Sequence, residues 1–442
     1  MIQNPWETKK KSKFRYNFRG WIIIAICMIA MILVYGIRHS FAVFFSPILK
    51  EFNWTRADVS FMLSLNVLVY GFLAPLPSII AKRFNPKRMM ILGVIILGMA
   101  TGSCSMATEL WHFYVLFGVL MPLGTAFCGW PMIGPALMNW FISKRGLVLG
   151  LGQVGGGLSF GYGILVERSI LLFGWRCSFL ILTGMLIVIL LTLYLFWFHF
   201  RPGDIGQKAY GSDEEQETSD TQLEKTFHIE SEKPSYQLRY IILSRQAWLL
   251  MISYALFWGM AVYVMIAHQV KFMEDAGFES VFAVSISAFL GITLALGQLS
   301  GFVSDWIGRE KTGTLASILC VVALVCLISV HNPKQSYLLY IYAPCFGFGA
   351  GLFTTTIIAG AADIFAGQNF GVMAGLLLTG MGIGGLIGPF FAGYSFDVLG
   401  SYIPSFIISI FSILLSCISF WLAGPRKGCY SFMTHLSKPL PK

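Results

Sequence analysis

The residues of this sequence that could do chemistry are the few charged side chains inside long apolar segments. A charge at the centre of a bilayer costs about 2.5–3.5 kcal/mol on insertion scales, so such residues are rare and usually functional. Arg38 is the basic residue that lies well inside an apolar segment. A guanidinium can hold a carboxylate with two parallel hydrogen bonds, which predicts a contact with a small organic anion. The alternative is that Arg38 reaches water from the end of its segment.

Two histidines are candidates for carrying a proton, because imidazole titrates near neutral pH. His39 follows Arg38, and His268 lies near the end of another apolar segment. A structural role is the alternative for both. Acidic side chains do not lie deep in any apolar segment; Glu167, Asp363 and Asp397 fall at segment ends. If transport is proton-driven, the proton would therefore travel on a histidine or on the substrate's own carboxylate. A uniporter or an exchanger is the alternative to proton coupling.

Polar and aromatic side chains in the apolar segments supply the remaining predicted substrate contacts: Tyr35, Asn66, Tyr70, Trp130, Gln153, Tyr263 and Gln298. Each could instead bridge two helices. Trp130, between Gly129 and Pro131, could stack on a ligand or fill a helix kink. The sequence has no HExxH or metal-spaced His/Cys set, so we predict neither an enzyme nor a cofactor or metal site.

The composition indicates the elements that must position these residues. The chain has 442 residues, of which 56% are hydrophobic and 12% charged, whereas a soluble globule carries about 25% charged residues. A bilayer-spanning helix needs about 20 apolar residues. We therefore predict an all-α membrane protein with twelve transmembrane helices at 20–46, 57–80, 88–107, 112–138, 146–168, 175–199, 247–271, 282–304, 312–331, 336–362, 370–396 and 402–424.

The distribution of basic residues predicts the orientation. Eighteen Lys and Arg lie in the tails and the connections on one side, and six lie in the loops on the other. Because Lys and Arg gather on the cytoplasmic side, both termini are predicted to face the cytoplasm from an inner or plasma membrane. This placement also explains the net charge of +10 without nucleic acid, since no soluble domain is present to bind it.

A repeat divides the chain into two similar halves. Landmarks recur at offsets of 222 to 226 residues: Ser78–Arg88 and Gly301–Lys311, Gly146–Gly150 and Gly371–Gly375, Pro122 and Pro344, Gly174 and Gly400. We predict an N-terminal six-helix bundle at 1–200, an acidic solvated linker at 201–245 and a C-terminal six-helix bundle at 246–442. A regulatory docking site is the alternative for the linker. Parallel six-helix repeats are typical of rocking transporters.

The segments Gly301–Lys311 and Ser78–Arg88 resemble the loop signature of the major facilitator superfamily. The second copy has its Gly301, Asp305, Gly308, Arg309 and Lys311. The first copy keeps Arg83, Lys87 and Arg88, but Ser78, Lys82 and Asn85 replace the family's Gly, Asp and Gly. The resemblance implies a cytoplasmic gate made by Gly301, Asp305, Arg309, Arg83 and Arg88.

Three further stretches resemble the monocarboxylate porter and oxalate–formate antiporter branch of that superfamily: Gly36–Pro47, Asn139–Gly150 with Gly155–Gly157, and Gly388–Tyr402. Oxalate–formate members hold a dianion with basic residues in spans eight and eleven. Residues 281–304 and 370–396 contain no Lys or Arg, so the sequence does not support a dicarboxylate clamp.

These observations together predict a secondary active transporter that moves a small organic anion, monocarboxylate-like, by alternating access, with protons as a candidate coupling ion. One alternative is a carrier of another small polar solute, such as an amino acid, nucleoside or siderophore, or a drug exporter. Another is a transporter-like receptor without net flux. The predicted partners are the substrate, the lipid bilayer and protons, and a monomer is favoured.

Overall fold

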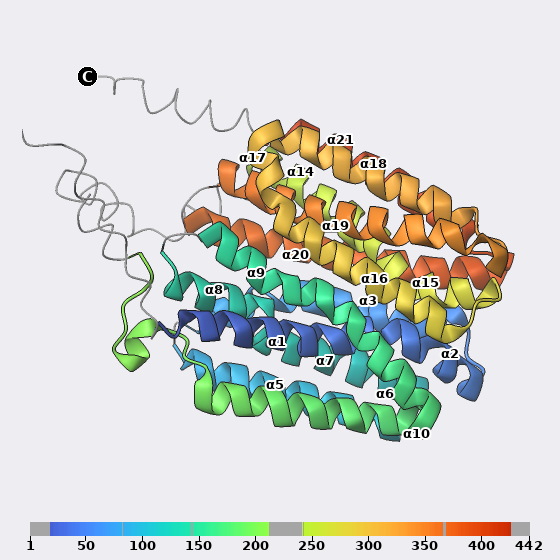
Figure 1. The fold of residues 1–442 in the computed structure, drawn as a ribbon, viewed down its shortest axis with the longest axis horizontal. Coiled ribbons are helices and arrows are strands. Elements are labelled where there is room, and N and C mark those ends of the chain that lie inside the picture. The colour runs from blue at the N-terminus through green and yellow to red at the C-terminus, as the bar shows by residue number, and fades with distance from the viewer. Residues whose placement is uncertain are drawn as a thin grey trace, which may run out of the picture.

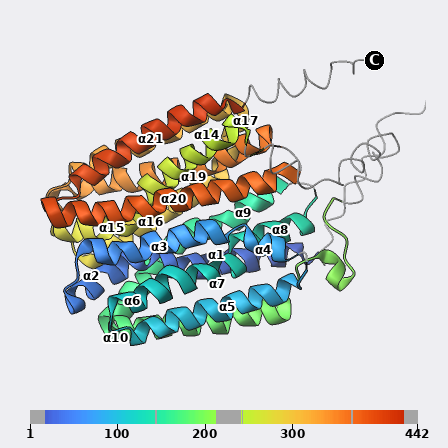
Figure 2. The same cartoon turned by 180° about the vertical axis from the view of Figure 1, so that it is seen from behind.

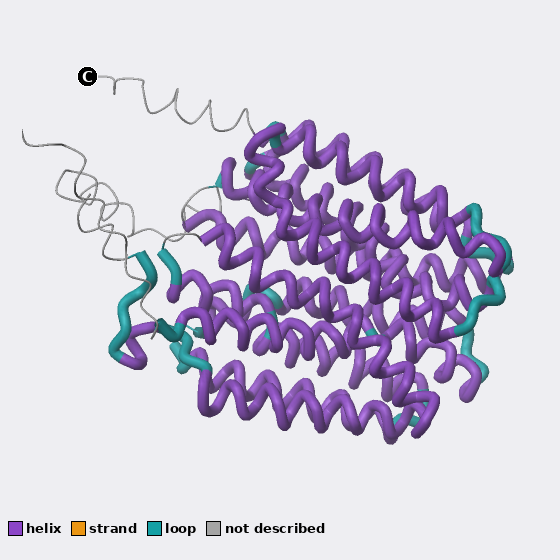
Figure 3. The backbone as a smooth tube through the Cα atoms, in the orientation of Figure 1, coloured by secondary structure: helices purple, strands orange, loops and turns teal. Residues whose placement is uncertain are grey.

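The computed structural model describes residues 18–81, 83–142, 145–211, 241, 243–365 and 368–425. The predicted basic N-terminal tail, Lys82, Lys144, most of the acidic linker and the C-terminal tail lie outside the described residues. The described chain is almost entirely helical (Figure 3). Its β structure is one isolated bridge between Phe141 and Tyr210.

The N-terminal half contains ten α-helices: α1 (Gly20–His39), α2 (Phe41–Phe52), α3 (Arg56–Leu73), α4 (Leu76–Ile80), α5 (Pro86–Ser103), α6 (Leu110–Phe113), α7 (Met121–Cys128), α8 (Trp130–Trp140), α9 (Arg145–Leu158) and α10 (Tyr162–Met185). Three π-helical segments extend these helices: η2 (Tyr114–Leu120), η4 (Leu186–Leu191) and η5 (Leu193–Trp197). Short 3₁₀ turns lie at η1 (Cys104–Met106), η3 (Ser159–Gly161) and η6 (Pro202–Ile205).

The C-terminal half contains longer helices: α14 (Arg245–Tyr254), the π-helical η7 (Ala255–Val262), α15 (Tyr263–Asp275), α16 (Ser280–Leu299), α17 (Val303–Ile307), α18 (Arg309–Ile328), α19 (Ser336–Ile364), α20 (Gln368–Leu399) and α21 (Ile403–Ala423). The turns η8 (Ser300–Phe302) and η9 (Pro333–Gln335) connect neighbouring helices.

Eleven helical stretches of the described chain are long and apolar enough to cross a membrane. The longest, Leu147–Trp197, contains Gly174, whose φ of 78° and ψ of 162° are not helical. The chain turns back at this residue, so the stretch supplies the fifth and sixth predicted spans. The predicted all-α fold is therefore confirmed. The first span runs on through α2 to Phe52, beyond its predicted end at residue 46, because Lys50 and Glu51 are tolerated in the last turn.

The helices form two bundles that lie side by side, the N-terminal half in blue to green and the C-terminal half in yellow to red (Figures 1 and 2). At the boundary between the halves, α3 packs along α20 and α9 packs along α16. We call the end where α1 begins and α21 ends the tail end. The opposite end, where α2 ends and α3 begins, is the distal end.

Glycines allow the close approach of helices that positions the bundles. Gly351 of α19 faces α16 so closely that a Cβ there would lie 2.8 Å from the backbone nitrogen of Gln298. Helices in a lipid bilayer gain no hydrophobic driving force by associating, so they associate through the close van der Waals packing that small residues permit at such crossings.

Replacing Gly351 by leucine is expected to lower the stability of the C-terminal half by about 1–3 kcal/mol or more, because the side chain would overpack a backbone contact. The measurement is thermal unfolding of the purified protein in detergent. Gly184→Leu in α10 is the matched control, since a Cβ at Gly184 would meet nothing within 4 Å. Equal losses in the two variants would contradict the packing explanation.

Candidate functional site

Arg38 lies near the middle of the helical stretch Gly20–Phe52 and is only 3% exposed. The side chain therefore does not reach solvent at a span end in this structure. Its burial follows from its position close to the C-terminus of α1, where α1 is covered by the rest of the N-terminal half and by the C-terminal half.

Three tyrosines from both halves surround the Arg38 guanidinium. Its Cζ lies 4.3 Å from the ring centroid of Tyr70 and 5.5 Å from that of Tyr35. Both distances are within the range of a cation–π contact. Nη1 donates to the Tyr263 hydroxyl at 3.5 Å, a long hydrogen bond. Tyr35 and Tyr70 also share a 2.7 Å hydrogen bond between their hydroxyls. The structure thus brings together Arg38, Tyr35, Tyr70 and Tyr263, four of the residues selected from the sequence as candidate substrate contacts.

The charge of Arg38 is not balanced by any carboxylate of the described residues. Nε and Nη2 are sealed from solvent and have no hydrogen-bond partner. The ion pairs of the described residues involve other cations, so no described carboxylate pairs with Arg38. An unpaired buried charge is costly unless something neutralises and hydrogen-bonds it. An anion is the kind of group that would neutralise and hydrogen-bond this guanidinium.

An aromatic cluster of the C-terminal half completes this site: Tyr254, Trp258 and Tyr263. The Trp258 ring centroid lies 6.4 Å from that of Tyr254 and 6.3 Å from that of Tyr263. Trp258 Nε1 donates to Thr354 Oγ1 at 2.8 Å, which fixes the indole. Tyr254, Trp258 and Thr354 were not among the residues predicted from the sequence. The four-residue spacing of Tyr254 and Trp258, which places them on one helix face, was the available signal.

Trp130 occupies a break in the fourth span. Gly129, with φ −97° and ψ −151°, separates α7 from α8, and Trp130 is the first residue of α8. Its ring lies against Gly134 and Gly152, where an added Cβ would lie 3.7 and 3.5 Å from ring carbons. Its backbone N–H donates to the Tyr35 hydroxyl. Trp130 therefore fills the break and also touches the residue that contacts Arg38.

The two candidate proton carriers occupy different places. His39 Nδ1 lies 2.7 Å from Ser159 Oγ, and its ring stacks on Phe160 with centroids 4.2 Å apart. His268 is fully buried between the halves, where Nε2 donates to the Pro389 carbonyl at 2.9 Å and Nδ1 has no partner. Only His39 lies beside the Arg38 site.

Three predicted contacts lie elsewhere. Asn66 donates from Nδ2 to the Phe117 carbonyl of η2 at 2.6 Å and so bridges two helices. Gln298 is buried on α16 with its Oε1 unpartnered. Gln153 lies half-buried on α9. None of these three contacts Arg38 in the hydrogen bonds of the described residues.

The predicted gate residues of the C-terminal half meet at the tail end. Arg309 Nη1 lies 2.6 Å from Asp305 Oδ1, and Arg309 Nε lies 2.8 Å from Asp363 Oδ2. A Cβ at Gly301 would lie 2.9 Å from Thr355 Cβ of α19. All of these residues belong to one half. Arg83 and Arg88 are exposed on the other half, and the described ion pairs do not join them to it.

Among the described residues, the ion pair that joins the two halves lies at the distal end instead. Arg56 of α3 pairs with Asp275 of α15 and donates to the Tyr402 hydroxyl at 2.8 Å. The backbone N–H groups of Arg56 and Ala57 donate to the carboxylate of Asp397 at 3.0 and 2.8 Å. The sequence analysis did not predict this cluster, because Arg56 and Asp275 are 219 positions apart.

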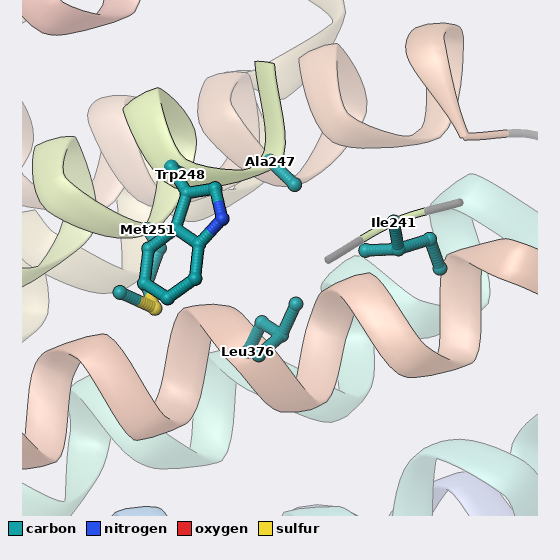
Figure 4. Close-up of a pocket in the computed structure, with 5 residues that line it drawn as sticks. All are labelled: Ile241, Ala247, Trp248, Met251 and Leu376. Atoms are coloured by element: carbon teal, nitrogen blue, oxygen red, sulfur yellow. The ribbon is translucent and has the colours of Figure 1, made fainter. Parts of the chain in front are cut away.

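A pocket of about 210 Å³ lies between α14 and α20 (Figure 4). Its lining is apolar: Ile241, Ala247, Trp248, Met251 and Leu376. None of the predicted site residues and no charged side chain is among the residues that line it.

Comparisons with known proteins agree with this architecture. The sequence profile of the Major Facilitator Superfamily matches residues 25–365. Monocarboxylate transporter 13 of Bos taurus is 26% identical over 426 residues, covering 95% of this chain and 92% of that protein. The same-named protein of Rattus norvegicus is 26% identical over 396 residues, with 88% and 85% covered. Monocarboxylate transporter 7 of Homo sapiens is 23% identical, with 92% and 86% covered.

A solved structure shares the fold. It is a bacterial homologue of the human lysosomal transporter Spinster in an inward-facing, unoccupied conformation. The TM-score is 0.66 at 15% sequence identity, and the match covers 96% of this chain and all of the other.

Proposed function

This chain belongs to the major facilitator superfamily and is a multi-pass membrane transporter, and we propose that it moves a monocarboxylate across the membrane by alternating access. The observation that carries the proposal is the buried guanidinium of Arg38, with Nε and Nη2 unpartnered. Two adjacent donors on a planar fork match the two oxygens of a carboxylate.

The charge of the site favours a substrate with one carboxylate over a substrate with two. Arg38 is the only buried Lys or Arg among the described residues. One guanidinium balances a single negative charge, and a second carboxylate would remain unpaired in the membrane interior. The names of the similar monocarboxylate transporters support the same substrate class.

A zwitterion such as an amino acid fits the site less well. Its ammonium group would need a carboxylate or several free acceptors. The described residues around Arg38 offer tyrosine hydroxyls, a histidine and an indole, but no carboxylate. Glu167 is the one buried acid of the described chain, and it lies toward the distal end, where its side chain bonds to Ser280.

The position of the site between the halves supports alternating access, because Arg38 comes from one bundle and Tyr263 from the other. In this proposal the distal cluster around Arg56 closes one side of the site. The gate at the tail end consists of Gly301, Asp305 and Arg309 from the C-terminal half and Arg83 and Arg88 from the N-terminal half. The basic tails and connections support a cytoplasmic position for the tail end, and His39 and His268 are the candidate proton carriers.

Uptake into proteoliposomes tests the proposal. We expect saturable uptake of labelled pyruvate and lactate, faster when the outside is more acidic, and little uptake of oxalate or alanine. Protein-free liposomes are the control for passive entry of the protonated acids. Absence of flux for every carboxylate would reject the substrate class. Oxalate uptake equal to that of pyruvate would reject the single-charge argument, and saturable binding without flux would favour a receptor.

A further inference from the structure

The hydrogen bonds around His39 fix which ring nitrogen carries its proton. Ser159 Oγ donates to the Gly156 carbonyl at 2.5 Å, and His39 Nδ1 lies 2.7 Å from the same Oγ. A serine hydroxyl has one proton. If that proton pointed to His39, two lone pairs of Ser159 and Gly156 would face each other at 2.5 Å. The proton of neutral His39 is therefore on Nδ1, and Nε2 holds the free lone pair.

The His39 ring is also held in place. Phe160 stacks on one face at 4.2 Å and an interplanar angle of 24°. Tyr35, one helical turn earlier, lies 6.1 Å from the ring and 5.5 Å from Arg38 Cζ. The Nε2 atom makes no hydrogen bond among those of the described residues and is not sealed from solvent. Nε2 is thus an available proton acceptor one residue away from the unpaired guanidinium.

Few other charges act on this ring. On its own helix, the charged neighbour is Arg38 and the titratable one is Tyr35. The turn η3 and the helix α8 carry no titratable side chain. On α10, Tyr162 donates its hydroxyl to Met185 Sδ at 3.8 Å, and the buried acid Glu167 lies more than one turn further toward the distal end, where its side chain bonds to Ser280. Cys128 of α7 bears no charge near neutral pH. On α9 the one basic residue, Arg145, begins the helix at the tail end, and on α2 Lys50 and Glu51 lie at the distal end.

Burial of the His39 ring opposes its protonation, and Arg38 is the charge that adds to this effect. While the guanidinium is unpaired, its positive charge opposes a second positive charge on the neighbouring imidazole. A carboxylate on Arg38 would cancel that field and make proton binding at Nε2 more favourable. By linkage, a proton on Nε2 would in turn tighten carboxylate binding by the same factor.

We propose that Ser159 is a positioning residue for proton-coupled transport: it holds His39 with its proton on Nδ1, so that Nε2 accepts the transported proton when a carboxylate occupies Arg38. The proposal rests on the proposed function. The proton comes from the solution on the side to which the site is open and leaves Nε2 after the carboxylate departs on the other side. On one side an O–H bond of a hydronium ion breaks as the Nε2–H bond forms, and on the other side the Nε2–H bond breaks as water takes the proton; no other bond changes.

The tautomer can be tested without any substrate. The full chain is labelled with ¹⁵N-histidine, and the His39 signals are assigned by difference from His39→Gln. The ¹⁵N shifts of the wild-type ring are expected to show a protonated Nδ1 and an unprotonated Nε2. Ser159→Ala is expected to lose this preference, and Ser253→Ala, which removes a buried hydroxyl bonded to Ser416, is expected to keep it. A wild-type ring with its proton on Nε2 would overturn the proposal.

Transport of labelled pyruvate separates positioning from a general structural role. Net uptake driven by a pH gradient is expected to fall about fivefold in Ser159→Ala, the effect of one hydrogen bond of about 1 kcal/mol. Exchange of pyruvate at equal pH needs no net proton movement and should stay within about twofold of wild type. A parallel fall in both rates would overturn the positioning role. Failure of the wild type to exchange pyruvate would count against the proposed function, while the tautomer measurement would still decide the role of Ser159.

Discussion

Replacing Arg38 by alanine is expected to abolish measurable monocarboxylate transport. The substitution removes the one buried cation of the described chain and both unpartnered donors of the site. Truncating one partner of a buried, hydrogen-bonded charge pair costs about 2–5 kcal/mol or more. Pyruvate affinity should therefore fall at least about 30-fold, as about 1.4 kcal/mol corresponds to tenfold. The measurement is the concentration dependence of pyruvate uptake and binding in proteoliposomes.

Two further variants keep the Arg38 prediction informative. Arg38→Lys retains the charge without the planar fork, so it should bind pyruvate more weakly than wild type but better than Arg38→Ala. Arg168→Ala, the same change at an exposed position of α10, should leave transport unchanged. The alanine variant should also be at least as stable as wild type in the absence of substrate, because it removes an unpaired buried charge. A stable Arg38→Ala protein that binds pyruvate with wild-type affinity would end the case for Arg38 as the anion contact.

The fold could be predicted from the sequence because a helix that spans the bilayer needs a long run of apolar residues, and such runs can be counted directly. The helical stretches and the predicted spans differ in number at Gly174. This glycine has a positive φ and turns the chain between two apolar runs without a polar loop, so two predicted spans form one helical stretch. Arg38 was also predictable, since a charge inside a span is costly wherever its side chain points.

The rest of the site could not be predicted by the same reasoning. Tyr254 and Trp258 are aromatic residues in an apolar helix, and nothing in their type distinguishes a site residue from one that faces lipid. Asn66 was selected because it is polar, but its amide reaches the Phe117 carbonyl of the π-helical η2. The direction in which a side chain points depends on packing, which one sequence does not reveal. The Ser159–His39 bond likewise joins residues 120 positions apart.

Arg56→Ala is expected to loosen the contact between the two halves at the distal end. Arg56 joins α3 to Asp275 and Tyr402, and its Cζ lies 3.4 Å from the ring centroid of Phe396. Its side chain is 13% exposed and that of Asp275 is 27% exposed, so solvent screens this pair less than a surface ion pair. Asp397 also accepts from the first N–H groups of α3, where a carboxylate complements the helix dipole.

Removing the Arg56 side chain should shift the equilibrium toward states open at the distal end by about 2 kcal/mol, or roughly 30-fold. Hydrogen–deuterium exchange detects this shift without labels. Exchange should become faster in two segments from different halves, residues 53–60 and 393–402, and net pyruvate transport should slow because one closed state is less populated. The effects of Arg56→Ala and Asp275→Ala on this opening should be less than additive in the double variant, because each single variant already removes the ion pair between the halves. Asp275 also pairs with Lys271, but that pair lies within α15 and does not join the halves.

Arg176→Ala is the matched control for this experiment. Arg176 is also a distal-end arginine that pairs with an acid, but its partner, Glu51, belongs to the same half. Both side chains of that pair are more exposed than those of the Arg56 pair, at 39% and 42%. The Arg176→Ala substitution should leave hydrogen–deuterium exchange in residues 393–402 unchanged, because it removes no contact between the halves. Arg56→Ala and Arg176→Ala could give the same hydrogen-exchange pattern, or exchange could become faster only in residues 53–60. Either result would show that Arg56 stabilises its own half locally and does not keep the distal side closed.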